Sequence, residues 1–252
     1  AAILAISGQG RSSLAVAPSA ENVLYVMSAQ GANMGGFGQN SLMGVFRSAF
    51  NGDPGSFFTM VNGTVPPATL TQKIGQSLLT NPLIAFLTEC GQGTSQSFNQ
   101  GWYDNVLAVD PVDPNRVWAG GIDLFRSDDG GQTWGAAGYW WKDRGTDPTY
   151  HHADQHAIVF HPQYNGTSNR IMFSGSDGGV ERIDNARAPV NTTLAQICGT
   201  PVAGGMNWID RSNGYVTTQF YDGAVYPDAQ TIFGGLQDNG TQRGTVSSPS
   251  WA

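Results

Sequence analysis

The stretch NVLAVDPVDPNRVWAGG, residues 105–121, decides the fold. Apolar residues alternate with small or polar ones up to Pro111, a short turn follows, and a second alternating run ends in two glycines. Alternation is the period of a β-strand, and a proline at the end of a strand cannot donate a ladder hydrogen bond, so it marks the exit into a turn. The stretch therefore predicts two antiparallel strands joined by a tight turn.

The same pattern occurs three more times, with prolines at Pro18, Pro162 and Pro227. The copies are SLAVAPSAENVLYVMSA (13–29), HAIVFHPQYNGTSNRIMFSGS (156–176) and DGAVYPDAQTIFGGLQDNG (222–240). A third short strand follows in GVFRS (44–48), DLFRS (123–127) and GVERI (179–183). A repeated antiparallel unit of this kind predicts an all-β fold, a β-propeller built from four-stranded antiparallel blades.

The four copies predict a partial ring of about four blades, all part of a single propeller domain that spans 1–252. We expect the blades to begin near residues 12, 104, 155 and 217, with long insertions at about 61–100 and 185–215. The first insertion has mixed periodicity and predicts a short helix between 68 and 92. A β-sandwich of unrelated hairpins is the alternative, and the matched motifs disfavour it.

The octet SDDGGQTW, residues 127–134, matches the Asp-box pattern S-x-D-x-G-x-T-W at Ser127, Asp129, Gly131, Thr133 and Trp134. We expect Asp129 to accept backbone N–H bonds within a tight turn, Gly131 to supply a positive φ, and Trp134 to pack between neighbouring sheets. These roles are structural, and the octet says little about activity.

Together these motifs resemble the BNR/Asp-box repeat β-propellers, which are related to sortilin and to xyloglucanase-type and sialidase-type glycoside hydrolases. The other segments that carry the resemblance are 101–104, 152–156, 176–179, 218–221 and 235–240, so it covers residues from about 12 to 243. The resemblance implies a secreted bacterial protein, at the cell surface or outside the cell. Because such propellers close with more blades, it also implies that further sequence or a partner chain completes the ring.

In a propeller the loops that enter the inner strands and the turns between the second and third strands share the top face, beside the central channel. This geometry is expected to gather side chains from separate blades into one acidic funnel. The candidate catalytic carboxylates are Asp104, Asp154, Asp177 and Asp238. The candidate ligand-binding residues are Tyr103, His152, His156, Gln219, Tyr221, Gln237 and Asn239, with Trp140 and Trp141 as an aromatic platform.

The predicted function is a glycan- or protein-binding or scaffold module that uses this funnel. The alternative is a glycoside hydrolase, which needs one protonated and one ionised carboxyl group about 5–9.5 Å apart. The arginine triad and the F/Y-R-I-P motif of sialidases are not found in the chain. The sequence establishes no cofactor, but Asp-Gly turns suit calcium, and His152, Asp154 and His156 suit a transition metal. In the simplest alternative, all these side chains only bond the loops between blades.

The composition limits the classes of partner. Lys and Arg total 12 against 19 Asp and Glu, a net charge of −7, so no basic face is available for nucleic acid. No run approaches the roughly 18 apolar residues of a membrane span. The only cysteines, Cys90 and Cys198, form either one disulfide or two buried thiols.

Overall fold

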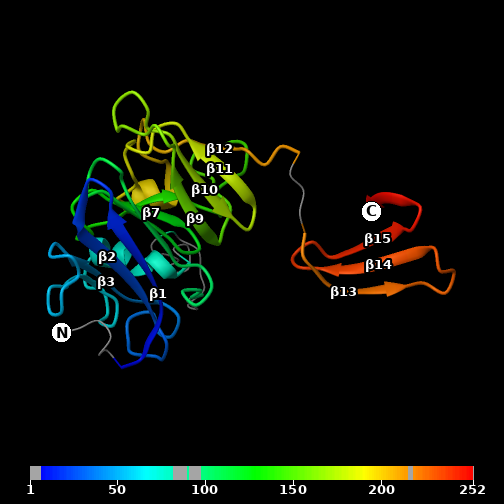
Figure 1. The fold of residues 1–252 in the computed structure, drawn as a ribbon, viewed down its shortest axis with the longest axis horizontal. Helices are drawn as coiled ribbons and strands as arrows, with labels where there is room; N and C mark the ends of the chain where they lie inside the picture. Colours follow the sequence, from blue (N-terminus) through cyan, green and yellow to red (C-terminus); the bar gives the residue numbers. More distant parts are fainter. Residues whose placement is uncertain (1–6, 82–89, 91–97, 215–217, 252) are drawn as a thin grey trace. The chain divides into compact units, whose positions relative to one another are not determined.

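The computed structural model describes residues 7–81, 90, 98–214 and 218–251, and it divides into two compact units, Ala1–Arg211 and Ser212–Ala252. The first unit contains three four-stranded antiparallel sheets and the second contains one (Figure 1). In every sheet the strands follow one another in chain order. A meander of four consecutive strands is the blade of a β-propeller, so the chain is all-β and forms a partial propeller.

The first sheet comprises β1 (Gln9–Ala17), β2 (Ala20–Gln30), β3 (Leu42–Ser48) and β4 (Phe58–Asn62). The second comprises β5 (Val106–Val109), β6 (Val117–Gly120), β7 (Leu124–Ser127) and β8 (Gly135–Gly138). The third comprises β9 (Gln155–Phe160), β10 (Met172–Ser176), β11 (Gly179–Ile183) and β12 (Trp208–Asp210). The second unit holds β13 (Phe220–Val225), β14 (Thr231–Leu236), β15 (Thr241–Thr245) and β16 (Ser248–Trp251).

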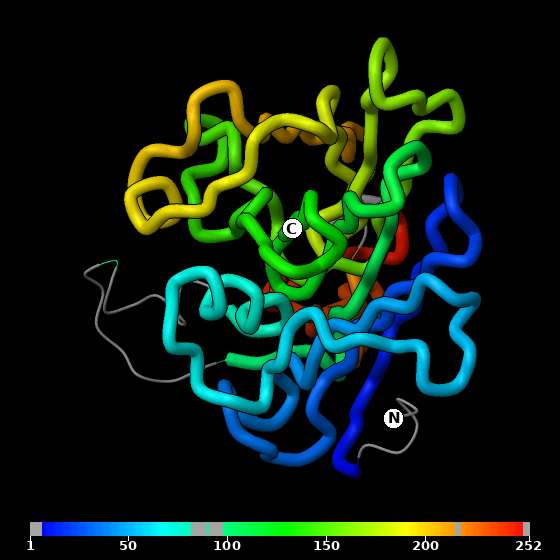
Figure 2. Tube along the Cα trace, turned by 90° about the vertical axis from the view of Figure 1, so that its left-hand side faces the viewer, coloured from blue at the N-terminus to red at the C-terminus, as the bar shows by residue number. Residues whose placement is uncertain are grey.

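The first strands of the three sheets in the first unit lie side by side, because β1 contacts β5 and β5 contacts β9. Figure 2 shows the second sheet, in green, between the blue first sheet and the yellow-green third sheet. Gly120 pairs with Val106, and Ser176 pairs with Gln155. The turns after β6 and β10 therefore lie beside the starts of β5 and β9, at the end of the unit that we call the top face.

The second sheet is buried on both faces. In β6, Val117 and Ala119 join a core shared with the first sheet, while Trp118 joins a core shared with the third. In β7, Phe125 points to the first core and Leu124 to the second. Successive side chains of a strand point to opposite faces, so a strand covered on both sides has no need of polar residues. This explains why all four residues of β6 are buried.

The 127–134 turn connects β7 to β8 and is held by its own side chains. The Asp129 carboxylate accepts the Thr133 hydroxyl at 2.6 Å and the Thr133 N–H at 2.9 Å, and the Ser127 hydroxyl donates to it at 2.8 Å. Gly131 has φ 88°, and Trp134 is buried with its indole N–H on the Gly131 carbonyl at 3.0 Å. Burial acts to raise the pKa of Asp129, but the hydrogen bonds from Thr133 and Ser127 outweigh it and lower that pKa.

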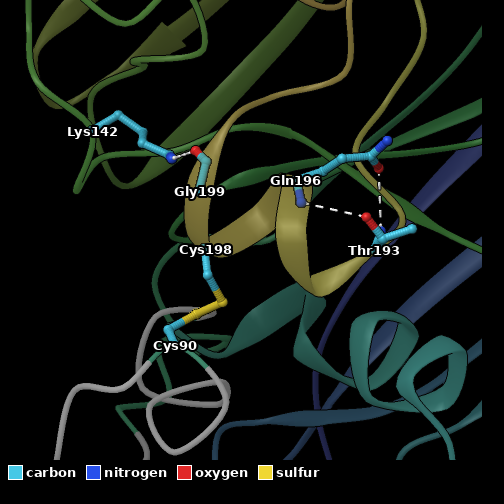
Figure 3. The surroundings of a disulfide bond; sticks show 6 residues. All are labelled: Cys90, Lys142, Thr193, Gln196, Cys198 and Gly199. Atoms are coloured by element: carbon cyan, nitrogen blue, oxygen red, sulfur yellow. Dashed lines mark hydrogen bonds between the residues drawn. A yellow bond between two sulfur atoms is a disulfide. The ribbon is translucent and has the colours of Figure 1, made fainter.

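The two long insertions of the first unit are joined covalently. Cys90, which follows the helices α1 (Leu70–Gln76) and η2 (Ser77–Leu79), forms a disulfide with Cys198 on the π-helix η3 (Ala195–Gly199). The two Cα atoms are 5.1 Å apart across a sequence separation of 108 residues (Figure 3). Lys142 donates to the Gly199 carbonyl beside the bond, at 2.9 Å. Among the described residues no helix is long and apolar enough to cross a membrane.

Candidate functional site

Five of the residues that the sequence suggested meet at the top face of the first unit. Tyr103 and Asp104 precede β5, Asp154 and His156 lie at the start of β9, and Asp177 lies in the turn between β10 and β11. We call these five residues the top-face cluster. It draws on two blades, because the entry loops and the turn share one edge of the neighbouring sheets.

The exposed part of the cluster is a bridge centred on Asp177. The His156 Nε2 lies 2.6 Å from Asp177 Oδ1, and the Tyr103 hydroxyl donates to the same oxygen at 3.1 Å. The Tyr103 and His156 rings meet edge to face with centroids 5.0 Å apart. Burial, followed by the charge of Asp177 and its hydrogen bond, raises the pKa of Tyr103 to about 12. The phenol therefore stays protonated and acts as a donor at neutral pH.

Trp102 extends this bridge with an aromatic surface. Its side chain is 60% exposed, and its ring lies 5.5 Å from that of Tyr103, centroid to centroid. The preceding Gly101 allows the chain to approach the first sheet closely, since a Cβ there would lie 2.7 Å from the Asn40 carbonyl oxygen. Arg11 on β1 donates to the Tyr103 carbonyl and holds the loop from the other side. The loop that carries the exposed Trp102 indole is therefore held in place from both sides.

Asp104 is the buried part of the cluster. It has no exposed surface, and neither carboxyl oxygen has a hydrogen-bond partner among the described residues. Burial, and then the negative charges of Asp154 and Asp177, raise its pKa to about 8. At neutral pH, Asp104 is therefore mainly in its protonated form.

Asp154 connects the two blades. Its backbone is left-handed, with φ 65°, its N–H donates to the Ile122 carbonyl at 3.0 Å, and its own carbonyl accepts the Asp177 N–H at 3.2 Å. Its carboxylate accepts the Gln100 side-chain amide at 2.9 Å. Asp123 lies beside it, fully buried, and accepts the Trp140 N–H at 2.8 Å. Burial is the main cause that raises the pKa of Asp123, and the charges of Asp154 and Asp104 add to it.

Other residues suggested by the sequence make contacts of their own outside the Tyr103–Asp177–His156 bridge. The His152 ring lies against Gly178, where an added Cβ would be 2.2 Å from His152 Cγ, and its Nδ1 is 3.1 Å from the Ala153 carbonyl oxygen. Trp140 is 39% exposed, whereas the Trp141 ring packs on that of Tyr139 at 4.6 Å and borders the core. The two tryptophans therefore do not form one exposed platform.

The remaining suggested residues lie in the second unit: Gln219, Tyr221, Gln237, Asp238 and Asn239. The Gln237 N–H donates to the Gln219 carbonyl at 2.9 Å, and the Asn239 amide donates to the Thr218 hydroxyl at 3.2 Å. Asp238 is left-handed, with φ 56°, and Tyr221 is 69% exposed. These contacts shape the turn between β14 and β15.

Sequence reasoning missed a buried pair of ionisable residues, His151 and Glu181. The His151 Nε2 lies 3.2 Å from Glu181 Oε2, and both side chains are at least nine-tenths buried. A signal was present in the GVERI strand: Ile183 faces the core, so Glu181, two residues earlier, faces the same way. A carboxylate at an inward position of a strand is rarely buried unless it is paired.

Among the described residues, no group of three or more His, Cys, Asp or Glu side chains is arranged to hold a metal ion. His152 and His156 in particular are used in separate contacts, with Ala153 and Asp177 respectively. The described residues of the cluster offer hydrogen-bond donors and acceptors, aromatic surface and titratable carboxyl groups.

No family model matches the chain, and no curated protein matches its sequence. Among solved structures, the chain is similar to a GH74 enzyme of Niastella koreensis (TM-score 0.41, 16% identity, covering 97% of this chain and 30% of that one). It is similar to the GH74 xyloglucanase of Xanthomonas campestris (TM-score 0.40, 16% identity, 95% and 30%). It is also similar to YCF48 of Cyanidioschyzon merolae (TM-score 0.24, 9% identity, 97% and 84%). The chain thus spans about 30% of the length of the two GH74 enzymes.

Proposed function

We propose that this chain is a glycan-binding propeller module whose top-face cluster, together with Trp102, forms the binding surface. The observation that carries the proposal is the exposed Trp102 indole beside the Tyr103–Asp177–His156 bridge. Aromatic faces pack on the apolar faces of sugar rings, while carboxylates, imidazoles and phenols bond their hydroxyl groups. Side chains of His156 and Asp177 are 37% and 32% exposed, so their remaining bonding capacity is open to a ligand.

A glycan array tests the proposal, with the 252-residue protein and its Trp102→Ala variant. We expect the variant to bind its best glycan about tenfold more weakly, a loss of ~1.4 kcal/mol. Phe58→Ala is the matched control, because Phe58 is also 60% exposed but lies on β4, the outermost strand of the first sheet. Unchanged binding by Trp102→Ala, or no binding to any glycan by the wild type, would contradict the proposal.

The second candidate function is glycoside hydrolysis, and Asp104 is the observation that favours it. Asp104, with its pKa raised to about 8, lies near the carboxyl groups of Asp154 and Asp177, and a protonated carboxyl group near a second one is what such a reaction needs. Burial of Asp104 keeps it from direct contact with a large substrate, so this function ranks second. If the protein releases chromophore from aryl glycosides, and if Asp104→Asn and Asp154→Asn each abolish this release, glycoside hydrolysis becomes the preferred function.

The same proposal has two further parts. The chain is an Asp-box propeller, and it works outside the cell or at the cell surface. The 127–134 turn supports the first, because its bonding follows the expected pattern of the octet. The Cys90–Cys198 disulfide supports the second, because such bonds persist in oxidising compartments.

A further inference from the structure

A pocket of about 350 Å³ lies in the first unit between the loop 144–150 and the strands β11 and β12. Its walls include Arg144, Tyr150, Glu181, Asn207, Trp208 and Asp210. It shares no lining residue with the top-face cluster. Its volume is at the small end of the range for ligand pockets, which suits a single small ring rather than an extended chain.

The charged side chains around the pocket are already paired with one another. Arg144 Nη2 lies 2.8 Å from Asp210 Oδ2. Asp147 accepts the Thr149 N–H at 2.8 Å and its hydroxyl at 2.6 Å, and lies 3.7 Å from the Lys142 ammonium. A charged ligand would have to compete with these ion pairs, whereas a neutral one would leave them intact.

The pocket also ends on the buried pair His151 and Glu181. His151 Nδ1 lies 2.8 Å from the His152 carbonyl oxygen, which can only accept, so Nδ1 carries the hydrogen and Nε2 presents a lone pair to Glu181. Burial lowers the pKa of His151 to about 4 and raises the pKa of Glu181, to which the charge of Asp210 adds. The imidazole is therefore neutral at physiological pH, and the Glu181 carboxyl group accepts the His152 N–H at 3.2 Å and the Ser176 hydroxyl at 3.5 Å.

The rest of the pocket lining consists of polar groups that can still form hydrogen bonds and of an apolar wall. The Asn207 side chain is exposed, and the half-buried Tyr150 ring lies with its centroid 6.0 Å from the Arg144 guanidinium carbon. The Trp208 indole N–H is already bonded to the Ala137 carbonyl at 2.9 Å, so its ring offers only apolar contact. Amide and guanidinium donors next to aromatic surface form the usual lining of a site for a polyhydroxylated ring.

We propose that this pocket binds one neutral pyranose unit of a glycan and is a second binding site, in addition to the top-face cluster. The proposal rests on the proposed function for its class of ligand, but it concerns a different set of side chains. Glu181 serves as part of the wall, and Asn207 bonds the sugar hydroxyls.

Saturation-transfer NMR and calorimetric titration of the 252-residue protein with xylose, glucose, galactose and mannose test the proposal, with glucosamine and glucuronate as charged analogues of glucose. We expect at least one neutral sugar to bind, and both charged analogues to bind at least tenfold more weakly than it does. Tighter binding of either charged analogue, or binding of none of the neutral sugars, would overturn the proposal.

Variants separate the pocket from the top-face cluster. Asn207→Ala is expected to weaken binding of the neutral sugar about tenfold, a loss of ~1.4 kcal/mol. Asn213→Ala, a change at another exposed asparagine, should leave it unchanged. Glu181→Gln keeps the size of a wall residue that makes no bond to the sugar in this proposal, and it should alter binding by less than about threefold (~0.6 kcal/mol), as should its control Glu21→Gln. A tenfold loss in Glu181→Gln would show that an ionised carboxylate binds the ligand and would sink the proposal.

Trp102→Ala distinguishes the two proposals. If this variant loses array binding while the pocket still takes the monosaccharide, both proposals stand. If Asn207→Ala has no effect on any sugar while Trp102→Ala abolishes array binding, the pocket proposal alone fails.

Discussion

At the residue scale, Asp104 shows how the surroundings of one side chain change its chemistry. An aspartate in water is ionised at neutral pH, but this one is enclosed, lacks a hydrogen-bond partner among the described residues and is close to two other carboxyl groups. Its folded-state pKa of about 8 lies above the unfolded value near 3.8. Folding therefore keeps a proton that the unfolded chain releases.

This difference makes the stability depend on pH in a known direction. Between about pH 4 and pH 8 the folded state binds more protons at Asp104 than the unfolded state, so the free energy of unfolding falls as pH rises, by at most ~1.4 kcal/mol per pH unit from this group. Asp104→Asn removes this contribution. We expect the variant to gain in Tm relative to the wild type as pH rises from 5 to 8, measured by thermal unfolding at each pH. An equal difference between the two proteins at both pH values would contradict the assignment.

At the element scale, the 127–134 turn shows why a short motif can be interpreted from sequence. The side-chain hydrogen bonds of Ser127, Asp129 and Thr133 join residues at most four positions apart, so their spacing determines the local geometry of the turn. The rest of the chain only anchors it, as where the Gly130 N–H donates to the Asn115 carbonyl at 2.8 Å. Glycine at position 131 meets the left-handed backbone at φ 88°.

The carboxylate of Asp129 is the centre of this turn. Asp129→Ala removes bonds to Thr133, Ser127 and the Gln132 N–H, and we expect it to lower the free energy of unfolding by about 2–3 kcal/mol. Asp53→Ala, at an exposed aspartate between β3 and β4 of the first sheet, should change the free energy of unfolding by less than about 0.5 kcal/mol. Denaturant unfolding measures both. Equal effects would show that the turn contributes no more than an ordinary surface loop.

The strands were predictable for a related reason, and the site was predictable only in part. Alternation, strand-end prolines and glycine turns are local signals, and they led to four antiparallel sheets, which the structure shows. Repetition also indicated that loops from different blades meet, as Tyr103, His156 and Asp177 do. The pairing of His151 with Glu181 depends on the path of the loop 144–150 over the third sheet, for which the sequence carries no local signal.

At the scale of the whole molecule, the four similar sheets differ in how much hydrophobic core they share with their neighbours. Every member of the two hydrophobic cores belongs to the first unit, and the inner faces of its three sheets bury each other. In the second unit all six residues of β13 are exposed. The repeat pattern could not reveal this division, because DGAVYPDAQTIFGG has the same alternation as the copies that are buried.

The division predicts the behaviour of a shortened chain. A protein ending at Arg211 retains both cores, and we expect it to unfold cooperatively within about 3 °C of the full chain. The isolated segment 212–252 has about the size below which domains rarely fold without extra links, and we expect it to be unfolded. Circular dichroism and calorimetry of the two pieces check this. Loss of cooperative unfolding in the longer piece would show that its cores are not self-sufficient.

Reduction of the disulfide is a second test at this scale. Removing the Cys90–Cys198 link frees a loop of 108 residues, and we expect the free energy of unfolding to fall by about 2–5 kcal/mol in reducing buffer. A matched double variant, Cys90→Ala with Cys198→Ala, should show the same loss and no further response to reductant. If the double variant still loses stability in reducing buffer, the effect of the reductant does not come from this disulfide.

The same covalent link also determines how the protein would tolerate damage. The second sheet and most of the third, with the whole top-face cluster, lie on the stretch of chain between Cys90 and Cys198. A protease that cuts this stretch once produces two fragments that remain tethered to each other, one carrying β1 and the other β12. On a gel run without reductant, the nicked protein would keep its full mass until a thiol is added.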